Sequence, residues 1–422
     1  MKFYIYTLGC KVNTYESNVM RDKLLNSGYI EVLEDNSDIY IINTCTVTNT
    51  SDNKSLKTIR QVIRKNNNAI IVVVGCMTQV NSKILDDLNV SIILGNSGKS
   101  EIVKYIEEYK KTGIQIKVID NIMEKEFEDM CLNNFNKTRA FVKIEDGCEN
   151  FCSYCIIPYA RGKVRSKKPN IVIDEIKDLV KDGHKEIVLT GIHTGHYGSD
   201  INYSFSKLLT DIENIEGLSR LRISSIEITE LDEEFLEVLK NSKILVDHMH
   251  IPLQSGSNEI LKLMNRKYNK EYFIDKINKI RSIRPDISIT TDIIVGFPSE
   301  TEELFKETVD TVNKIRFSKI HVFPFSLRKG TKAEELPNHI DDKIKKDRVK
   351  ELIMLSKELE VEYFNKFIGK KVEYLPEIYK EGYVIGHTGN YLSVKTNGTI
   401  EDINNIKEVI IKKVEYPYVI GE

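Results

Sequence analysis

The chain lacks the long apolar segments that mark membrane proteins and signal peptides. Its 422 residues include no tryptophan, and no window approaches the roughly 20 apolar residues that span a bilayer. The start, MKFYIYTLGC, carries neither the charged leader nor the long apolar segment of a signal peptide. With 41% hydrophobic and 29% charged residues, the chain has the composition of a globular protein, and its length predicts about three domains. We therefore expect a cytoplasmic protein with no membrane partner.

Excess charge of one sign is also lacking, and cysteine is scarce. The formal net charge is −2, so any surface that binds nucleic acid must be local. There are seven cysteines, and an odd number in a reducing compartment argues against a disulfide framework. Metal ligands, redox groups or buried apolar filler remain as their possible roles.

Strand and helix patterns alternate over the first hundred residues, which predicts a parallel α/β sheet. The apolar run Phe3–Leu8 precedes a helix for which Asn13 is the expected N-cap and Glu16 its capping-box partner. Gly28 is expected to end this helix. The next strands are expected at Ile39–Ile42, Ile70–Val74 and Ser91–Leu94.

Three cysteines follow the first three of these strands. Cys10, Cys45 and Cys76 stand in TLGC, INTC and VVGC. Ligands of open parallel sheets bind at the carboxyl ends of the strands, so this placement favours one shared site. The alternative is three separate buried cysteines, the usual role of a free cysteine.

Three further parts follow the N-terminal one. Residues 112–137 are polar and are interpreted as a connector. From Arg139 onward six strands alternate with helices, too few for an eightfold barrel, so a partial (βα)6 barrel is predicted. A charged helix at about Asp341–Phe367 leads to short strands that predict a small all-β barrel. The expected domains are residues 1–111, 138–368 and 369–422. The six barrel strands are expected at Phe141–Ile144, Glu186–Leu189, Leu221–Ser224, His248–Ile251, Ile287–Ile294 and Lys319–Phe323.

The motif GCENFCSYC carries the strongest chemical signal. Cys148, Cys152 and Cys155 lie within eight residues directly after the first barrel strand. A structural zinc site needs four ligands, so a zinc ion here would require a fourth ligand from a distant part of the chain. Iron–sulfur clusters are normally held by four cysteines, and three would leave one iron open to another ligand.

CxxxCxxC after the first strand of a partial βα barrel resembles the radical S-adenosylmethionine superfamily. Within it, the whole chain resembles the methylthiotransferases. The match runs through TLGCKVNTYES, INTCTVTN, VVVGCMTQ, IEDGCENFCSYCIIPYARG, HIPLQSGSNEILKLMNR and DIIVGFPSET, and the C-terminal β segment resembles a TRAM domain. The resemblance implies two 4Fe–4S clusters, one on Cys10, Cys45 and Cys76 and one on Cys148, Cys152 and Cys155.

The resemblance also implies the reaction. The barrel cluster would bind and cleave S-adenosylmethionine to a radical that activates a C–H bond, and the N-terminal cluster would present the sulfur. TLGCKVN, NTCTVT and IPLQSGS resemble the branch that methylthiolates C2 of N6-threonylcarbamoyladenosine beside the tRNA anticodon. The alternatives are isopentenyladenosine in tRNA, a ribosomal protein, or a non-catalytic RNA-binding protein with structural metal sites.

Cofactor contacts beyond the cysteines are expected at strand ends and in the cysteine loop. The glycines of GIHTG allow the backbone to approach a cofactor closely. Tyr154 stands directly before the last cysteine of the motif, and in the superfamily the residue at this position lies near the adenine of the cofactor. A turn role is an equal alternative for the later positions. The candidates are Tyr154, Gly191, Gly195, Gln254, Ser255, Asp292 and Gly296.

Two acid-free basic stretches predict RNA contacts near the cysteines, with ordinary solvated faces as the alternative. The C-terminal segment, with seven Lys and eight Asp or Glu, adds no basic surface, and Tyr383 and Tyr391 can either stack on bases or pack in a core. Expected partners are the tRNA anticodon stem-loop and an electron donor such as flavodoxin or ferredoxin, with the protein a monomer. The RNA candidates are Lys54, Lys57, Arg60, Arg64, Arg161, Lys163, Arg165, Lys167 and Lys168.

Overall fold

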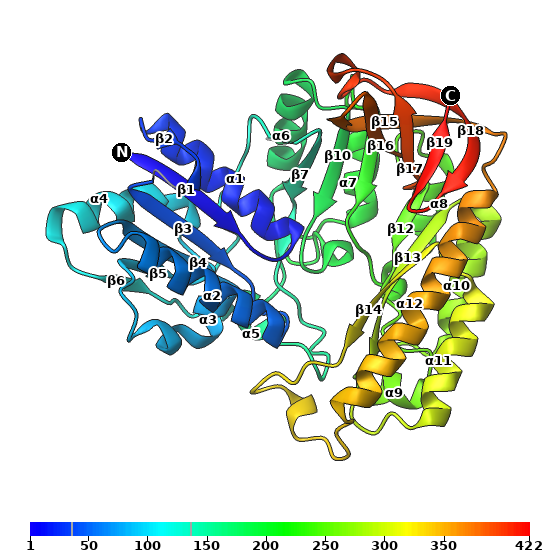
Figure 1. The fold of residues 1–422 in the computed structure, drawn as a ribbon, viewed down its shortest axis with the longest axis horizontal. Helices are drawn as coiled ribbons and strands as arrows, with labels where there is room; N and C mark the ends of the chain where they lie inside the picture. Colours follow the sequence, from blue (N-terminus) through cyan, green and yellow to red (C-terminus); the bar gives the residue numbers. More distant parts are fainter. Residues whose placement is uncertain (35–36, 136) are drawn as a thin grey trace.

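The N-terminal part is a parallel six-stranded sheet. The computed structural model describes residues 1–34, 37–135 and 137–422, and the strand order of this sheet is β2-β1-β3-β4-β5-β6 (Figure 1). The strands β3 and β4 are buried along their whole length, as the apolar runs Ile39–Ile42 and Ile70–Val74 predict. The six strands are β1 (Lys2–Thr7), β2 (Ile30–Glu31), β3 (Ile39–Thr44), β4 (Ile70–Gly75), β5 (Ile92–Leu94) and β6 (Ile116–Val118).

Helices cover both faces of this sheet. Side chains of α1 and α4 pack into one apolar cluster and those of α2 and α3 into another, on opposite sides of the strands. This is the doubly wound arrangement that places a ligand site outside the carboxyl ends of the strands. The helices are α1 (Lys11–Asn26), α2 (Asn49–Lys65), α3 (Cys76–Asn81) and α4 (Ile102–Thr112).

Two sequence predictions for this part are wrong. Helix α1 begins at Lys11, and its N-cap residue is Cys10, three residues before the predicted cap Asn13. Asn13 is recruited elsewhere, because its side-chain amide donates to the carbonyl oxygens of Leu8 and Thr44 at 2.7 and 2.9 Å. Glu16 is fully buried and binds cations instead of the helix start.

The predicted connector is also not a plain linker. Its residues Ile116–Val118 form β6, the edge strand of the N-terminal sheet. Further along, Met130, Leu132 and Phe135 are buried in the core of the next part. The segment therefore belongs to both cores, and its polar composition conceals its few anchoring apolar residues.

The central part is the predicted partial barrel of six parallel strands. They form two three-stranded sheets, β11-β10-β7 and β12-β13-β14, which Leu221 and Leu245 join by a parallel bridge. Each observed strand overlaps its predicted range. The strands are β7 (Arg139–Lys143), β10 (Glu186–Thr190), β11 (Arg220–Ile223), β12 (His248–His250), β13 (Ser288–Val295) and β14 (Lys319–Pro324).

Helices line the outside of this curved wall, and their apolar faces fill the largest core of the molecule. The predicted long charged helix is α12, which packs along β14. A two-stranded ladder of β8 (Glu145–Asp146) and β9 (Arg165–Ser166) closes the loop that holds the cysteine motif. The helices are α5 (Ile157–Arg161), α6 (Pro169–Lys181), α7 (Phe205–Glu213), α8 (Glu233–Asn241), α9 (Asn258–Leu263), α10 (Lys270–Ile283), α11 (Glu302–Ile315) and α12 (Asp342–Asn365).

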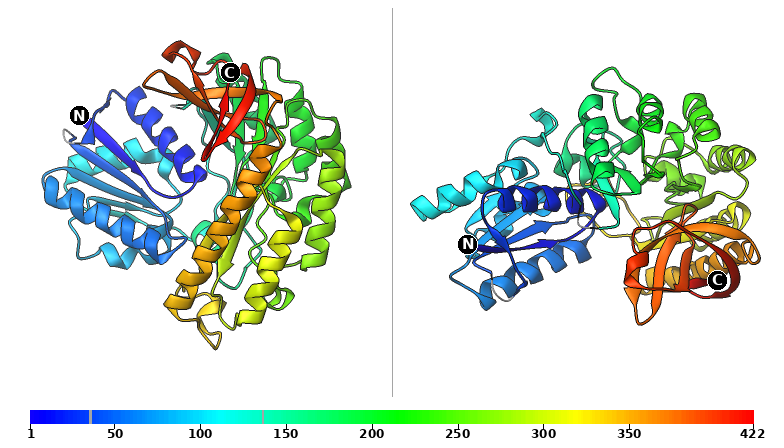
Figure 2. Two further views of the ribbon diagram at one scale, coloured as in Figure 1. Left: turned by 45° about the vertical axis from the view of Figure 1, so that its right-hand side comes forward. Right: turned by 90° about the horizontal axis from the view of Figure 1, so that it is seen from above.

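The C-terminal part is a closed β-barrel of order β15-β16-β17-β19-β18, which confirms the predicted small all-β unit. The N-terminal sheet and this barrel lie around the central wall as separate bodies (Figure 2). No helix of the described residues is long and apolar enough to cross a membrane. The strands are β15 (Lys371–Lys380), β16 (Tyr383–Thr388), β17 (Ser393–Asn397), β18 (Lys407–Glu415) and β19 (Tyr418–Gly421).

Candidate active site

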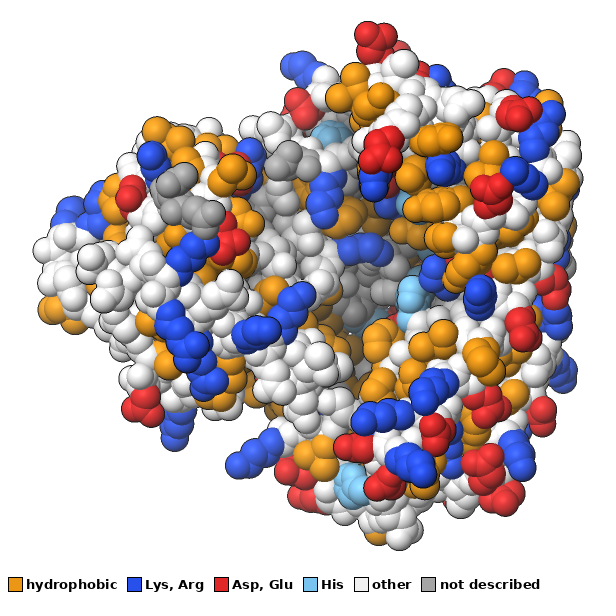
Figure 3. Space-filling view, viewed as in Figure 1, with side chains coloured by type: hydrophobic (Ala, Val, Ile, Leu, Met, Phe, Trp, Pro, Cys, Tyr) orange, Lys and Arg blue, Asp and Glu red, His pale blue; other side chains and the backbone are white. Residues whose placement is uncertain are grey.

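Six of the seven cysteines surround one cavity of about 380 Å³. The cavity lies where the carboxyl ends of the N-terminal strands face the open side of the partial barrel, and the surface is hollowed between these two parts (Figure 3). Cys131, the seventh, is exposed in the predicted connector and does not line it. The six lining cysteines are Cys10, Cys45, Cys76, Cys148, Cys152 and Cys155.

Backbone geometry brings the first three thiols close together. Cys10 caps α1 after β1, Cys45 follows β3 and Cys76 begins α3 after β4. Gly9 lies so close to Cys45 that a β-carbon on it would stand 2.9 Å from the Cys45 Sγ. Gly75 takes a φ of +109°, a backbone conformation that favours glycine, directly before Cys76. The glycines in TLGC and VVGC thus serve the approach of the cysteines.

The second triad is held by its own loop. The amide of Cys148 donates to the carbonyl oxygen of Gly162 at 3.0 Å, and that of Cys155 to the carbonyl oxygen of Cys152 at 3.0 Å. Gly147 has a φ of +92°, and a β-carbon there would stand 1.8 Å from the Lys163 carbonyl oxygen. Only glycine fits at this position, so the GC pair of the motif has a steric cause.

Nitrogen donors from distant segments reach the sulfurs. The Arg161 Nε and the Asn96 Nδ2 donate to Cys76 Sγ at 3.3 and 3.4 Å. The guanidinium of Arg266 donates to Cys152 Sγ at 3.3 Å. Such donors stabilise a negatively charged sulfur and tune a bound iron–sulfur group. Sequence reasoning missed Asn96 and Arg266, because nothing in their local pattern points to sulfur.

The thiols themselves fit a metal cluster better than a free redox pair. Burial raises the pKa of Cys45 to about 11 and that of Cys155 to about 12, and it raises the pKa of Cys148 as well. These groups are therefore neutral thiols at neutral pH unless a metal ion deprotonates them, as coordinating metals do. Two sets of three thiols facing one cavity match clusters that each leave one iron open.

Arg161 corrects the predicted RNA surface. Its side chain is fully buried, and it pairs with Glu16 at 2.5 Å and with Asp146 at 3.2 Å. Lys99 and Lys143 bind the same Glu16 carboxylate at 2.5 and 2.8 Å. Burial alone would raise the pKa of Glu16, but these three cations hold it well below its ordinary value. The network joins the N-terminal part to the barrel beside Cys76, and Arg161 is not available to phosphate.

Two further basic candidates are also buried. Lys167 forms an ion pair with Glu175, and Arg165 donates to the Arg161 carbonyl oxygen at 2.6 Å. The stretch contains no acid in sequence, but the fold supplies acids from elsewhere. Lys163 and Lys168 of this stretch are exposed, as are four residues on one helix, α2: Lys54, Lys57, Arg60 and Arg64.

The structure brings four of the cofactor candidates to the cavity and leaves three away from it. Tyr154, Gly191, Gln254 and Asp292 line the cavity. Gln254 holds a φ of +67°, and its amide donates to the Asp292 carbonyl oxygen at 2.8 Å. Strained backbone of this kind is concentrated at functional sites.

Gly195, Ser255 and Gly296 do not line this cavity, so the structure does not bring these three candidates to its wall. Ser255 is fully buried and bonds the Thr308 hydroxyl at 3.3 Å. A β-carbon on Gly195 would meet the Glu230 carboxylate, and one on Gly296 would meet the Lys345 side chain. All three positions are explained by packing and turns.

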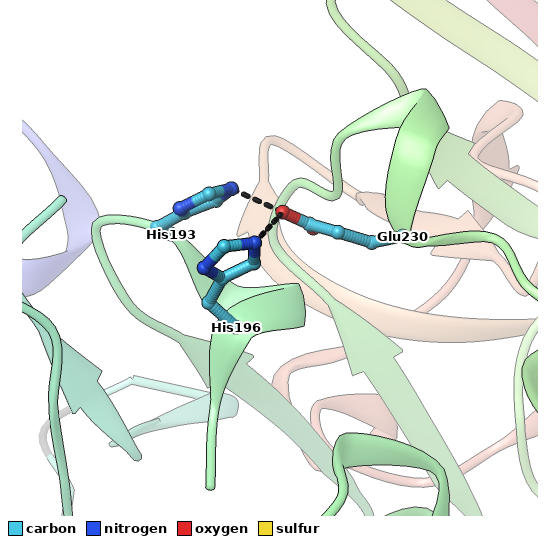
Figure 4. Close-up of side chains that lie close together, drawn as sticks. All are labelled: His193, His196 and Glu230. Atoms are coloured by element: carbon cyan, nitrogen blue, oxygen red, sulfur yellow. Dashed lines mark ion pairs between the residues drawn. The ribbon is translucent and has the colours of Figure 1, made fainter. Parts of the chain in front are cut away.

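Beside the barrel triad, His193 and His196 both point toward the Glu230 carboxylate (Figure 4). The Nδ1 of His193 lies 3.8 Å from Cys148 Sγ. Burial and the neighbouring His193 lower the pKa of His196. Since His193 is already placed against a cysteine, we interpret the Glu230 carboxylate as a partner that orients this ring, and we do not interpret the group as a separate metal site.

A second cavity of about 690 Å³ adjoins the first. Cys10, Gly191 and Asp292 line both. Its volume suits a small organic group, and its walls come from the N-terminal part, the barrel strands and the C-terminal barrel. Sequence reasoning assigned no role to most of its polar lining, which includes Lys11, Arg139, Arg222, His248, His250 and Tyr391.

Comparison with known proteins agrees with this layout. Residues 142–312 match the Radical SAM superfamily, and residues 2–95 match the uncharacterized protein family UPF0004. The chain is 43% identical to the threonylcarbamoyladenosine tRNA methylthiotransferase MtaB of Bacillus subtilis, covering 99% of this chain and 95% of that protein. It is 40% identical to the protein of the same name from Aquifex aeolicus, covering 97% and 100%.

A second name also occurs among the relatives. The tRNA-2-methylthio-N(6)-dimethylallyladenosine synthase of Natranaerobius thermophilus is 38% identical, covering 85% of this chain and 82% of that protein. Among solved structures, the radical S-adenosylmethionine methyltransferase TsrM from Kitasatospora setae matches with a TM-score of 0.56 at 14% identity, covering 76% of this chain and 72% of that one. That likeness bears on the fold alone. Because it is 40% or more identical to the MtaB proteins over nearly its full length, the chain belongs to the radical S-adenosylmethionine methylthiotransferase family.

Proposed function

We propose that this enzyme methylthiolates C2 of N6-threonylcarbamoyladenosine next to the anticodon of tRNA. The single observation that carries the proposal is the meeting of both cysteine triads at one cavity. An enzyme that must make a radical and deliver sulfur to the same carbon needs both centres within reach of one substrate. Full-length relatives named for this modification support the choice of nucleoside.

Two 4Fe–4S clusters and S-adenosylmethionine are the cofactors, and when bound they supply the radical, the sulfur and the methyl group. We assign Cys10, Cys45 and Cys76 to one cluster and Cys148, Cys152 and Cys155 to the other. The rest of the site positions and shields them. Arg161 and Arg266 donate to the ligand sulfurs, and Tyr154, Gly191, Gln254 and Asp292 form the wall available to S-adenosylmethionine.

We propose that the exposed cations of α2 bind RNA phosphates. Lys54, Lys57, Arg60 and Arg64 project from the helix that follows Cys45, and Lys and Arg side chains gather over this part of the surface beside the hollow (Figure 3). Phosphate contacts position a nucleic acid without reading its sequence. Lys163 and Lys168 remain candidates, whereas Arg161, Arg165 and Lys167 are withdrawn.

The remaining assignments depend on this reaction. Because a radical S-adenosylmethionine enzyme needs one electron for each cleavage, we propose a flavodoxin or ferredoxin as the donor. We place the enzyme in the cytoplasm, where tRNA is found, and expect a monomer, since one chain provides both triads. A dimethylallyladenosine substrate is the second candidate, favoured by relatives such as the Natranaerobius protein.

The test is a reaction with defined substrates. The anaerobically reconstituted enzyme is incubated with S-adenosylmethionine, a reductant and anticodon stem-loops that carry either the threonylcarbamoyl or the dimethylallyl group. Mass spectrometry of the nucleosides is expected to find a methylthio product from the first stem-loop. Product from the dimethylallyl stem-loop alone would overturn the substrate assignment, and zinc in place of iron would overturn the radical chemistry.

A further inference from the structure

The larger cavity is unusually cationic on the side that adjoins Cys10. Lys11 comes from the start of α1, Arg139 from β7 and Arg222 from β11, and all three line the same space. They belong to two separately folded cores, so the cluster exists only when the N-terminal part and the barrel are in place. A cavity that gathers cations from separate elements suits an anionic ligand group.

Only two of these three cations have an acidic partner among the described residues. The Arg222 Nε is paired with Glu186 at 2.7 Å, and Arg139 pairs with Glu377 at 3.1 Å. In the part of the chain that the structure describes, the Lys11 ammonium has neither a hydrogen bond nor an ion pair. Since an ammonium facing a cavity gains from an anionic partner, Lys11 is the free contact of the group.

Tyr391 brings a donor from the C-terminal barrel to the same place. Its hydroxyl accepts a hydrogen bond from Arg139 at 3.2 Å, and no acceptor for its own proton is found among the described residues. Burial alone would raise the pKa of this phenol, but Arg139, Arg222 and Lys11 lower it below its ordinary value. The polarised O–H is thus ready to donate to an anion.

The position of Tyr391 is held at a cost in backbone strain. Its φ is +69°, a region that non-glycine residues rarely adopt. The ring stacks on His248 and His387 at centroid distances of 4.8 and 4.7 Å, and Arg222 fixes the loop through the Gly389 carbonyl oxygen at 3.1 Å. The fold therefore directs this side chain into the cavity rather than into a core.

We propose that Lys11, Arg139, Arg222 and the Tyr391 hydroxyl form a carboxylate-binding site that receives the threonyl carboxylate of the substrate nucleoside. The inference rests on the proposed function and deepens it, since a dimethylallyl group carries no charge and gains nothing from this site. In adenine, the ring nitrogen N1 is bonded to both C2 and C6, and C6 carries the N6 group. A carboxylate bound at Lys11 therefore places C2 on the side of the cavity that is lined by Cys10, the preceding residue in the chain.

A phosphate of the RNA backbone offers similar anionic oxygens, so the test separates the two sources. Binding of the reconstituted enzyme to labelled anticodon stem-loops is measured by anisotropy, with one stem-loop carrying the threonylcarbamoyl group and the other an unmodified adenosine. Wild-type enzyme is expected to prefer the first. In Lys11→Met this preference is expected to fall about tenfold, equal to about 1.4 kcal/mol, with affinity for the unmodified stem-loop unchanged.

Three variants guard the interpretation. Lys11→Arg keeps the charge and is expected to retain the preference, and Tyr391→Phe is expected to lose part of it while keeping the ring. Lys57→Met, on the exposed face of α2, is expected to weaken both stem-loops equally. Iron content is measured for each variant, because Lys11 adjoins a cluster cysteine; if Lys11→Met loses iron, Tyr391→Phe decides the outcome.

The outcomes are distinguishable. If Lys11→Met weakens both stem-loops equally, the lysine contacts phosphate and the carboxylate site is wrong. If both Lys11→Met and Tyr391→Phe keep the wild-type preference, the site is also wrong although the proposed function stands. If the wild-type enzyme forms no methylthio product from the threonylcarbamoyl stem-loop, the proposed function itself fails.

Discussion

At the scale of single residues, the meaning of a side chain depends on partners far away in the sequence. Arg161 lies in a stretch free of acids, which predicts phosphate binding, yet it pairs with Glu16 from 145 positions away. The cysteines behave differently, because glycines and strand ends in their own segments position them. Residue types that carry chemistry could thus be found from sequence, whereas the burial of a charge could not.

The buried network around Glu16 makes a clear stability prediction. Glu16→Gln leaves Lys99, Lys143 and Arg161 without their shared carboxylate. We expect a loss of about 3–5 kcal/mol in the free energy of unfolding, measured by denaturant titration. Glu101→Gln, which removes an exposed pair with Lys104, is the control and is expected to change little. Equal stability of Glu16→Gln and wild type would contradict the network's role.

The same carboxylate predicts a pH dependence. Its pKa lies well below the ordinary value in the folded protein, so protonation favours the unfolded chain. The stabilisation is present above the unfolded pKa of about 4.3 and is lost as the pH falls further. The stability difference between wild type and Glu16→Gln is therefore expected to shrink between about pH 5 and pH 3. A constant difference over this range would refute the assignment.

The two triads are expected to have separable roles. Cys76→Ala should still cleave S-adenosylmethionine but should form no methylthio product, because only the N-terminal cluster is lost. Cys148→Ala should lose both activities. Chromatography of 5′-deoxyadenosine and mass spectrometry of the nucleosides check this, and full methylthio product from Cys76→Ala would show that its cluster is not required.

At the scale of elements, the alternation of strands and helices was predictable almost throughout. Apolar runs such as Ile70–Val74 mark buried parallel strands with little ambiguity. The errors occur where an element is short or its ends are set by tertiary contacts. Strand β6 has three residues in a polar segment, and α1 starts at Lys11 because Cys10 occupies the N-cap position at that edge of the sheet.

Helix α2 carries the element-scale prediction. Replacing Lys57, Arg60 and Arg64 by Gln removes three exposed charges without touching the buried face at Leu56, Ile59 and Val62. We expect weaker tRNA binding and a log Kd against log salt slope shallower by about 2–3. Lys346 and Lys350, exposed on α12, provide a matched control. An unchanged salt slope would exclude α2 from the RNA surface.

At the scale of the whole molecule, three folded parts assemble two adjoining cavities. The sequence predicted both triads, but not that they share a cavity or that Tyr391 reaches from the C-terminal barrel to Arg139. Such contacts depend on how separate cores dock, and no local pattern encodes that. The same limit explains why the sequence does not point to Lys11, next to a predicted cluster cysteine, as the substrate contact that we propose.

Metal content follows from this assembly. The reconstituted enzyme is expected to bind about eight iron atoms per chain, and Cys148→Ala about four. Iron and sulfide assays with electron paramagnetic resonance check both values. About four iron atoms in the wild-type enzyme would mean that one triad does not hold a cluster.

The most direct test of the central claim is nucleoside mass spectrometry of tRNA from cells that lack this gene. The account predicts that 2-methylthio-N6-threonylcarbamoyladenosine disappears, that its unmethylthiolated precursor accumulates, and that the wild-type gene but not Cys76→Ala restores the product. Persistence of this nucleoside together with loss of a different methylthio product would contradict the account.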